Sequence, residues 1–386
     1  MSRKNFYRRQ PLAARLTKLI MQVAVGSAAT SGVFLTAPRR TGKSTFARED
    51  LRPALEEAGA IVLYADLWKD LTKGPRTIIG ETVREALGRN EKLMMQLVIA
   101  PRLETISVGR VNFYVNTIGL GEEIDLTKAF AALSDESKKL IVLIIDETEH
   151  AITTDEGVAA LFALKAARDE LNSSKHYGLR IVCIGSNQDK LAMLRNSSDE
   201  AFFGASMLQL PMLDKDFIDW YCKALDLPHD LDSSDVFQLF QENGYRPELF
   251  NAAVKGVRFD ITVGPEAILV RFAELVRAQA EAFNANFQAG IRGLTPVQSA
   301  VLRVMGAKGE SFAPFESSTM ELYSKAIENA GIETSASKIE VADVQLALMA
   351  LQEKQLVWKT SRGVYSVEEQ VIVDLLRKDG LLDVLV

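Results

Sequence analysis

The segment from Ala37 to Ser44 constrains the fold of this chain more than any other part of the sequence. An apolar run at 32–36 precedes it, and from Thr45 the residues have the spacing of a helix. A loop of the pattern G-x-x-x-x-G-K-[ST] between a strand and a helix is typical of a phosphate-binding site. Ala37 stands where the pattern has its first glycine, a departure of one methyl group. The sequence therefore predicts a strand, a phosphate-binding loop and a helix.

The residue types of this loop fit a triphosphate with a divalent cation. Backbone N–H groups and the positive end of a helix hold phosphates in such loops. Lys43 would reach the terminal phosphates, and the Ser44 hydroxyl would ligate Mg²⁺. The predicted cofactors are ATP and Mg²⁺; the alternative is an ordinary turn without a ligand. The residues expected to bind the nucleotide are Ala37, Pro38, Arg39, Arg40, Thr41, Gly42, Lys43, Ser44 and Thr45.

A pair of acidic residues follows a second apolar run later in the chain. The run at 140–145 ends in Asp146 and Glu147. A continuous apolar run indicates a strand buried on both faces of a parallel sheet. Open α/β sheets bind ligands at the carboxyl ends of their strands. We expect Asp146 to hold Mg²⁺ and Glu147 to polarise the attacking water, although two solvated acids at a strand end are the alternative.

A third predicted strand, at 179–184, is followed by Gly185, Ser186 and Asn187. A polar side chain at this strand end can orient the lytic water and contact the γ-phosphate. Asn187 is the candidate and Ser186 the reserve. The same three residues are also ordinary turn formers.

The composition limits the class of protein. The chain has 386 residues, 47% of them hydrophobic and 25% charged, which is typical of a soluble globular protein of two or three domains. No apolar run approaches the roughly 20 residues of a membrane-spanning helix, so we expect no membrane partner. The use of cysteine fits a reducing compartment, and we expect a cytoplasmic protein. The two cysteines, Cys183 and Cys222, and three histidines do not form the pattern of a disulfide framework or a zinc site.

The order of the predicted elements divides the chain into three parts. Residues 1–213 alternate strands and helices, with further strands at 60–66 and 207–210, which predicts an α/β fold: a parallel sheet with helices on both faces. Residues 108–118 alternate apolar and polar side chains, as in a half-exposed strand of a hairpin.

The two remaining parts have different patterns. Residues 214–288 have helical periodicity and no strand-like run. In residues 289–386, helices at 295–305 and 341–353 precede two short strands separated by a turn at 361–363. Helices followed by a β-hairpin are typical of a winged helix-turn-helix.

Together these motifs resemble the archaeal-type ATPase branch of the AAA+/STAND superfamily of P-loop NTPases. Pro38 to Ser44 matches the Pro-Arg-Arg-x-Gly-Lys-Ser/Thr loop of that branch, 143–147 matches its Walker B strand, and 185–187 matches its sensor 1 position. The resemblance implies an AAA+-like ATPase core at 1–213, a helical lid at 214–288 and a winged-helix domain at 289–386. It also implies that Arg246, in Gly-Tyr-Arg-Pro, is a sensor 2 residue near the γ-phosphate.

The sequence differs from that branch at one position that affects the expected rate of ATP hydrolysis. Relatives often carry Gly-Arg before the last strand of the core, where this chain has Gly204 and Ala205. An arginine finger contributes orders of magnitude to the rate of phosphoryl transfer. We therefore expect slow, Mg²⁺-dependent ATP hydrolysis. A homo-oligomer is a further expectation.

The charge of the third part bears on its partner. From residue 295 to the end, the sequence contains nine Lys and Arg and thirteen Asp and Glu, so the net charge of this part is minus four. Phosphate contacts dominate non-specific DNA affinity, so an acidic module is a poor general DNA binder, although Lys354, Lys359 and Arg362 lie near the predicted wing. Two functions stay open: an ATPase that regulates a nucleic-acid transaction, and a signalling or defence ATPase whose tail docks a protein. Glu147 argues against a third, a scaffold that never hydrolyses ATP.

Overall fold

The protein is described by a computed structural model that forms two compact units. The first, here the sheet unit, comprises 8–37 and 42–210; the second, the helical unit, comprises 1–7, 38–41 and 211–386. The three predicted domain ranges stay a prediction. The described residues are 6–22, 30–88, 106–108, 111–113, 125–173, 176–195, 200–225, 227, 230–260, 262, 264–328, 339–359 and 364–382.

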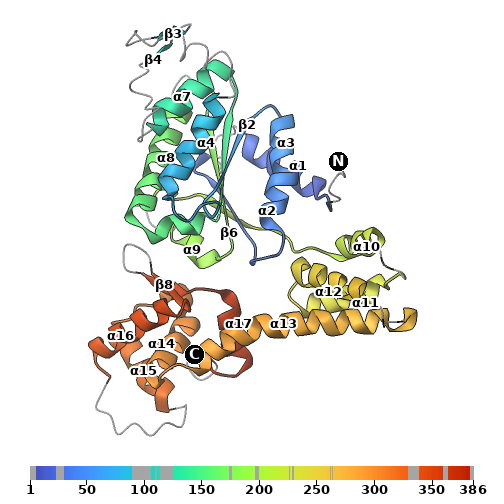
Figure 1. The fold of residues 1–386 in the computed structure, drawn as a ribbon. Coiled ribbons are helices and arrows are strands. Elements are labelled where there is room, and N and C mark those ends of the chain that lie inside the picture. Colours follow the sequence, from blue (N-terminus) through green and yellow to red (C-terminus); the bar gives the residue numbers. More distant parts are fainter. Residues whose placement is uncertain are drawn as a thin grey trace. The chain divides into compact units, whose positions relative to one another are not determined.

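A five-stranded parallel sheet forms the centre of the sheet unit (Figure 1), which confirms the predicted α/β class. Its strand order is β2-β5-β6-β1-β7, so the first strand in the chain lies inside the sheet. All residues of β1, β5 and β6 are buried, as their largely apolar sequences predict. The strands are β1 (Val33–Thr36), β2 (Ile61–Asp66), β5 (Ile141–Asp146), β6 (Leu179–Gly185) and β7 (Ser206–Gln209).

Helices cover both faces of this sheet (Figure 1). α1 (Gln10–Met21) and the helix after β1 pack on the face that carries Leu35, Ile144 and Ile184. The opposite face is covered by α4 (Pro75–Gly88), α7 (Leu126–Ser137) and α8 (Asp155–Ser173), which contact one another. A short helix, α9 (Gln188–Ala192), follows β6.

The helix after β1 is not uniform. It begins as α2 (Lys43–Phe46), widens into a π-helical segment, η2 (Ala47–Leu51), and continues as α3 (Arg52–Glu57). Pro53 has no N–H and cannot donate to the carbonyl of Glu49 four residues earlier. The Arg8 guanidinium donates to that carbonyl instead. Arg8, which lies just before α1, thus binds the helix that leaves the predicted phosphate loop.

The expected strand at 108–118 is partly described. β3 (Ile106–Val108) and β4 (Val111–Phe113) pair antiparallel, as in the predicted hairpin. Residues 114–118, and the predicted turn at 361–363, lie outside the described residues. No helix in the described ranges has both the length and the apolar character that crossing a bilayer requires.

The first half of the helical unit is a group of helices around an aromatic core. Phe240 contacts Phe217 and Phe250 at ring-centroid distances of 5.5 and 5.1 Å. The side chains of Asp214 and Asp232 accept hydrogen bonds at the starts of the first two helices, as N-caps do. The helices are α10 (Lys215–Ala224), α11 (Ser233–Glu242), α12 (Pro247–Phe259) and α13 (Ile268–Arg292).

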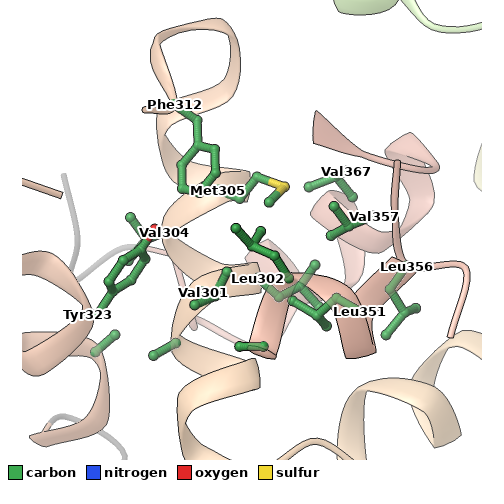
Figure 2. Close-up of a cluster of buried hydrophobic side chains, with 14 of the residues drawn as sticks. Val301, Leu302, Val304, Met305, Phe312, Tyr323, Leu351, Leu356, Val357 and Val367 are labelled. Carbon is green, nitrogen blue, oxygen red and sulfur yellow. The ribbon is translucent and has the colours of Figure 1, made fainter. Parts of the chain in front are cut away.

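The second half has its own apolar core (Figure 2), which includes Leu302, Tyr323, Leu351 and Val357. Helices precede two antiparallel strands, which is the order that the sequence predicts. Two helices were not predicted, α15 before the strands and α17 after them. The capping box of Thr295 and Gln298 begins the first helix. The elements are α14 (Pro296–Lys308), α15 (Ser317–Glu328), α16 (Val341–Glu353), β8 (Val357–Lys359), β9 (Tyr365–Val367) and α17 (Gln370–Lys378).

Candidate nucleotide site

The predicted phosphate loop joins the end of β1 to the start of α2. Gly42, the residue before α2, has φ 88°, a left-handed conformation that glycine adopts without strain. The Phe46 N–H donates to the Gly42 carbonyl at 2.9 Å, which closes the first turn. The N–H groups before Phe46 therefore have no partner within the helix and are available to an anion. The Ala37 N–H donates to the Gly185 carbonyl at 3.4 Å, which links the loop to the end of β6.

Lys43 is the first residue of α2 and is only 5% exposed. Among the described residues, no carboxylate forms an ion pair with it. A buried ammonium group without a counter-charge is costly, and a phosphate group would supply the missing charge. The loop residues therefore fit a bound triphosphate.

The register of the sheet aligns the acidic pair with this loop. Asp146 is level with Ile184 of β6, and Ile184 is level with Leu35 of β1. β6 alone separates the two strands, so their carboxyl ends lie about 10 Å apart. The sheet thus places Asp146 and Glu147 at the edge where Lys43 and Ser44 begin α2. A hydroxyl and a buried carboxylate at this edge are oxygen donors of the type that Mg²⁺ takes beside phosphates.

Both oxygens of the Asp146 carboxylate accept hydrogen bonds. Oδ2 accepts from the Tyr64 hydroxyl at 2.5 Å, and Oδ1 accepts from the Glu147 N–H at 3.1 Å. Burial, followed by the charge of Asp146, raises the pKa of Tyr64. The Arg48 guanidinium lies 4.9 Å from the centre of the Tyr64 ring and pairs with Asp66 at 2.5 Å.

Glu147 has an unusual backbone conformation for a glutamate. Its φ and ψ are 55° and 44°, in the left-handed region. Such backbone costs of order 1–3 kcal/mol for a residue other than glycine and occurs preferentially at functional sites. It turns the chain from β5 into the 3-10 segment η3 (Thr148–Thr153).

The segment after β6 is held by a carboxylate that the sequence analysis did not identify. Glu149, which is buried, accepts hydrogen bonds through Oε1 from the Ser186 N–H at 2.8 Å and the Ser186 hydroxyl at 2.6 Å. The side-chain oxygen of Asn187 accepts from the Lys190 N–H at 3.0 Å and so caps α9. The amide nitrogen of Asn187 keeps its capacity to donate, whereas the Ser186 hydroxyl is engaged with Glu149.

The remaining predicted residues belong to the helical unit, which contains loop residues 38–41. The Thr41 hydroxyl donates to the Pro38 carbonyl at 2.7 Å. Arg39 pairs with Glu369 just before α17.

Arg246 pairs with Glu248 at 2.6 Å, and Arg40 lies 3.7 Å from the same carboxylate oxygen. Both guanidinium groups also lie over the ring of Phe283, at 4.9 Å for Arg40 and 4.1 Å for Arg246. Arg246 and the loop residue Arg40 therefore share one carboxylate.

The residues predicted for the site thus fall into two groups. Lys43, Ser44, Asp146, Glu147 and Asn187 lie at the carboxyl edge of the sheet, and Arg39, Arg40 and Arg246 pair with carboxylates in the helical unit. Their catalytic roles stay predictions. Tyr64, Arg48 and Glu149 were missed, because their partners are distant in the sequence.

Several solved structures resemble the whole chain. The Walker-type ATPase PABY2304 of Pyrococcus abyssi aligns with a TM-score of 0.54 and 15% identity, covering 97% of this chain and 97% of that one. The ORC2 protein of Aeropyrum pernix in its ADP form also aligns with a TM-score of 0.54 and 13% identity. This alignment covers 99% of the present chain and 95% of the ORC2 chain. The structure of its ADPNP and ADP complexes aligns with a TM-score of 0.51 and 14% identity, covering 99% of the present chain and 96% of the ORC2 chain.

At these identities the likeness concerns the fold alone. No protein-family model and no curated protein sequence matches the chain. The structural likeness nevertheless spans both units, and the five-stranded parallel sheet carries the phosphate loop and the acidic pair at one edge. The chain therefore has the fold that these archaeal Walker-type ATPase and ORC2 structures share.

Proposed function

We propose that this protein binds ATP with Mg²⁺ and hydrolyses it slowly, so that the bound nucleotide acts as a switch. The observation that carries the proposal is the buried Lys43, which has no carboxylate partner among the described residues and lies at the sheet edge of Asp146 and Glu147. An anionic ligand supplies the counter-charge that Lys43 lacks.

Each residue of the sheet edge has a distinct part in this proposal. Lys43 and the N–H groups at the start of α2 bind the phosphates, while Ser44 and Asp146 hold the cation. A bound Mg²⁺ would neutralise charge on the phosphate oxygens. Glu147 accepts the proton of the attacking water, and the amide nitrogen of Asn187 orients that water. Arg246 is proposed to contact the γ-phosphate in exchange for Glu248.

Slow ATP turnover is proposed because few arginine side chains are available to stabilise the charge of the transition state. The position before β7 that could carry an arginine finger has Gly204 and Ala205. Arg39 pairs with Glu369, and Arg246 has to give up its ion pair with Glu248 before it can contact the γ-phosphate. A finger is worth 10³–10⁵ in rate, so its absence favours a long-lived ATP state.

Substitution of Glu147 tests the hydrolytic part of the proposal. Glu147→Gln should lower ATP turnover by about 10²- to 10⁴-fold and leave ATP affinity unchanged, because only the proton acceptor is lost. Glu57→Gln, an exposed position at the end of α3, is the matched control and should turn over ATP as the wild type does. Normal turnover by Glu147→Gln would show that the acidic pair is not catalytic.

The proposed switch acts through residues 289–386, which we interpret as a winged helix. One client is a nucleic acid, with the chain as an ATP-dependent regulator of its processing. The second is a protein, and the surface of α16 favours it. Leu346 and Met349 are 66% and 54% exposed on this helix, which contains no Lys or Arg. A recognition helix for DNA needs cationic and polar side chains at such positions.

Retention on duplex DNA distinguishes the two clients. The full chain is passed over immobilised duplex at two salt concentrations, with ATP and without it. ATP-dependent retention that falls steeply with salt would support the nucleic-acid role, because phosphate contacts release counterions. No retention at low salt would exclude that role and leave protein docking. Size measurement of the same samples tests for a homo-oligomer.

A further inference from the structure

We propose that Tyr64 is a positioning residue that fixes the Asp146 carboxylate in the orientation in which it holds the cation. The inference rests on the proposed function, since it gives Asp146 the role of a cation ligand. Tyr64 itself contacts neither the nucleotide nor the cation in this proposal. It acts through the hydrogen bond from its hydroxyl to Oδ2 of Asp146.

The sheet register explains how Tyr64 reaches Asp146. Tyr64 of β2 is level with Ile144 of β5, two residues before Asp146. Residues two apart on a strand lie on the same face, and a diagonal neighbour on the next strand is within reach of an aromatic side chain. The phenol therefore extends along the sheet toward its carboxyl edge and ends at the Asp146 carboxylate.

The Tyr64 ring is held in place by the helix that leaves the phosphate loop. Arg48 belongs to the π-helical segment η2, and its guanidinium stacks 4.9 Å from the ring centre. The same guanidinium pairs with Asp66 at 2.5 Å. Widened helical turns of this kind are frequent at functional sites. Arg48 thus connects the helix of Lys43 to the strand beside Asp146.

Arg48 also offsets the charge of a second carboxylate, Asp66, at this edge of the sheet. Asp66 is level with Asp146 on the adjacent strand, so two carboxylates end neighbouring strands. Like charges this close repel each other. The ion pair with Arg48 neutralises Asp66 and leaves the negative charge of Asp146 for the cation.

Two donors from different segments then fix a single orientation of Asp146. The Tyr64 hydroxyl binds Oδ2, and the Glu147 N–H binds Oδ1. Hydrogen bonds of this kind orient the ligands of metal ions, and their removal typically costs 10- to 100-fold in metal affinity. A carboxylate without the Tyr64 bond would have to lose rotational freedom each time the cation binds.

The test compares nucleotide affinity with Mg²⁺ and with EDTA, using a fluorescent ATP analogue as the probe. The ratio of the two dissociation constants measures the contribution of the cation. Tyr64→Phe should leave the EDTA value unchanged and reduce the Mg²⁺ enhancement by about 10- to 100-fold. Tyr177→Phe, an exposed tyrosine of the same unit, is the control and should behave as the wild type.

Two further variants separate positioning from a general packing role. Arg48→Gln, at a side chain that is 46% exposed, should also reduce the Mg²⁺ enhancement without disturbing the core. In the Asp146→Asn background, Tyr64→Phe should have no further effect, because the group that it positions is already changed.

The outcomes distinguish this inference from the proposed function. Equal loss of affinity in EDTA and in Mg²⁺ would assign Tyr64 a packing role and overturn the inference. An unchanged Mg²⁺ enhancement in Tyr64→Phe would overturn it as well, while the proposed function survives. Absence of nucleotide binding by the wild-type chain would overturn both.

Discussion

Glu149 illustrates how much of this site depends on single residues. Its carboxylate binds the Ser186 N–H and hydroxyl and lies directly against Gly185. A Cβ atom at Gly185 would lie 2.1 Å from Oε2 of Glu149 and 2.8 Å from a methyl carbon of Leu191. Glycine is thus required here by the close approach of a buried carboxylate.

Gly185→Ala should therefore displace Glu149 and the segment that contains Ser186 and Asn187. We expect a stability loss of about 1–3 kcal/mol and reduced ATP turnover, with ATP affinity largely retained. Thermal unfolding and a turnover assay measure the two effects. Gly290→Ala is the control: its Cβ would make only ordinary contacts, at 3.7 Å or more, so stability should rise or stay unchanged. Wild-type turnover by Gly185→Ala would contradict a functional role for this segment.

The two cysteines allow a second prediction at this scale. Burial raises the pKa of Cys183 from 9.0 to about 12 and that of Cys222 to about 11. Both stay protonated at neutral pH, and the thiolate is the reactive form. We expect slow reaction of the native protein with DTNB at pH 7.5, a rate that rises with pH, and complete reaction in urea. Rapid reaction of either native thiol at pH 7.5 would contradict this prediction.

The sequence predicts single residues only where chemistry and local pattern coincide. Lys43, Ser44, Asp146 and Glu147 belong to short motifs with fixed spacing, so they could be identified without a structure. Glu149 could not, because its burial depends on a partner 37 positions away. The same holds for Tyr64, whose partner is 82 positions away.

Among the elements, α16 shows how one helix can have two apolar faces with different roles. Leu348 is fully buried in the core of the second half of the helical unit, whereas Leu346 is 66% exposed. Met349 is also 54% exposed, and the exposed positions of α16 include Asp343 and Gln345 as well. The exposed apolar side chains of α16 are the surface on which the proposed protein-docking role depends.

The two leucines of α16 form a matched pair for mutation. Leu348→Ala should cost about 2–5 kcal/mol in the unfolding free energy of the helical unit, because it leaves a cavity in a closed core. Leu346→Ala should change it by no more than about 0.5 kcal/mol. Urea unfolding followed by circular dichroism provides the comparison. Equal losses for both variants would indicate that the outer face is covered within the chain.

Most strands were predicted within one or two residues, because runs such as 141–145 are apolar throughout. The helix after the phosphate loop was also predicted, but its π-helical segment was not. Pro53 is visible in the sequence, yet the widened turn also involves Arg8, which binds the Glu49 carbonyl from a distant segment. Non-local contacts of this kind have no local sequence signal.

At the scale of the whole molecule, the candidate nucleotide site depends on the strand order of one sheet. The order β2-β5-β6-β1-β7 brings together residues from three separate stretches of chain, because parallel strands end at the same edge. The sequence predicted this α/β class and the likeness in fold to archaeal AAA+ ATPases. It could not reveal that loop residues 38–41 would group with the helical unit, since their ion pairs join distant segments.

The most direct test of this arrangement measures ATP affinity, with Mg²⁺ and with EDTA, for Lys43→Ala and Asp146→Asn. Lys43→Ala should lose roughly 10- to 100-fold in affinity in both conditions, because the phosphates lose a charged partner. Asp146→Asn should match the wild type in EDTA and lose only the Mg²⁺ enhancement. Lys128→Ala, at an exposed lysine of α7, is the control. Wild-type affinity of Lys43→Ala, or full Mg²⁺ enhancement in Asp146→Asn, would contradict a shared nucleotide and cation site at this edge.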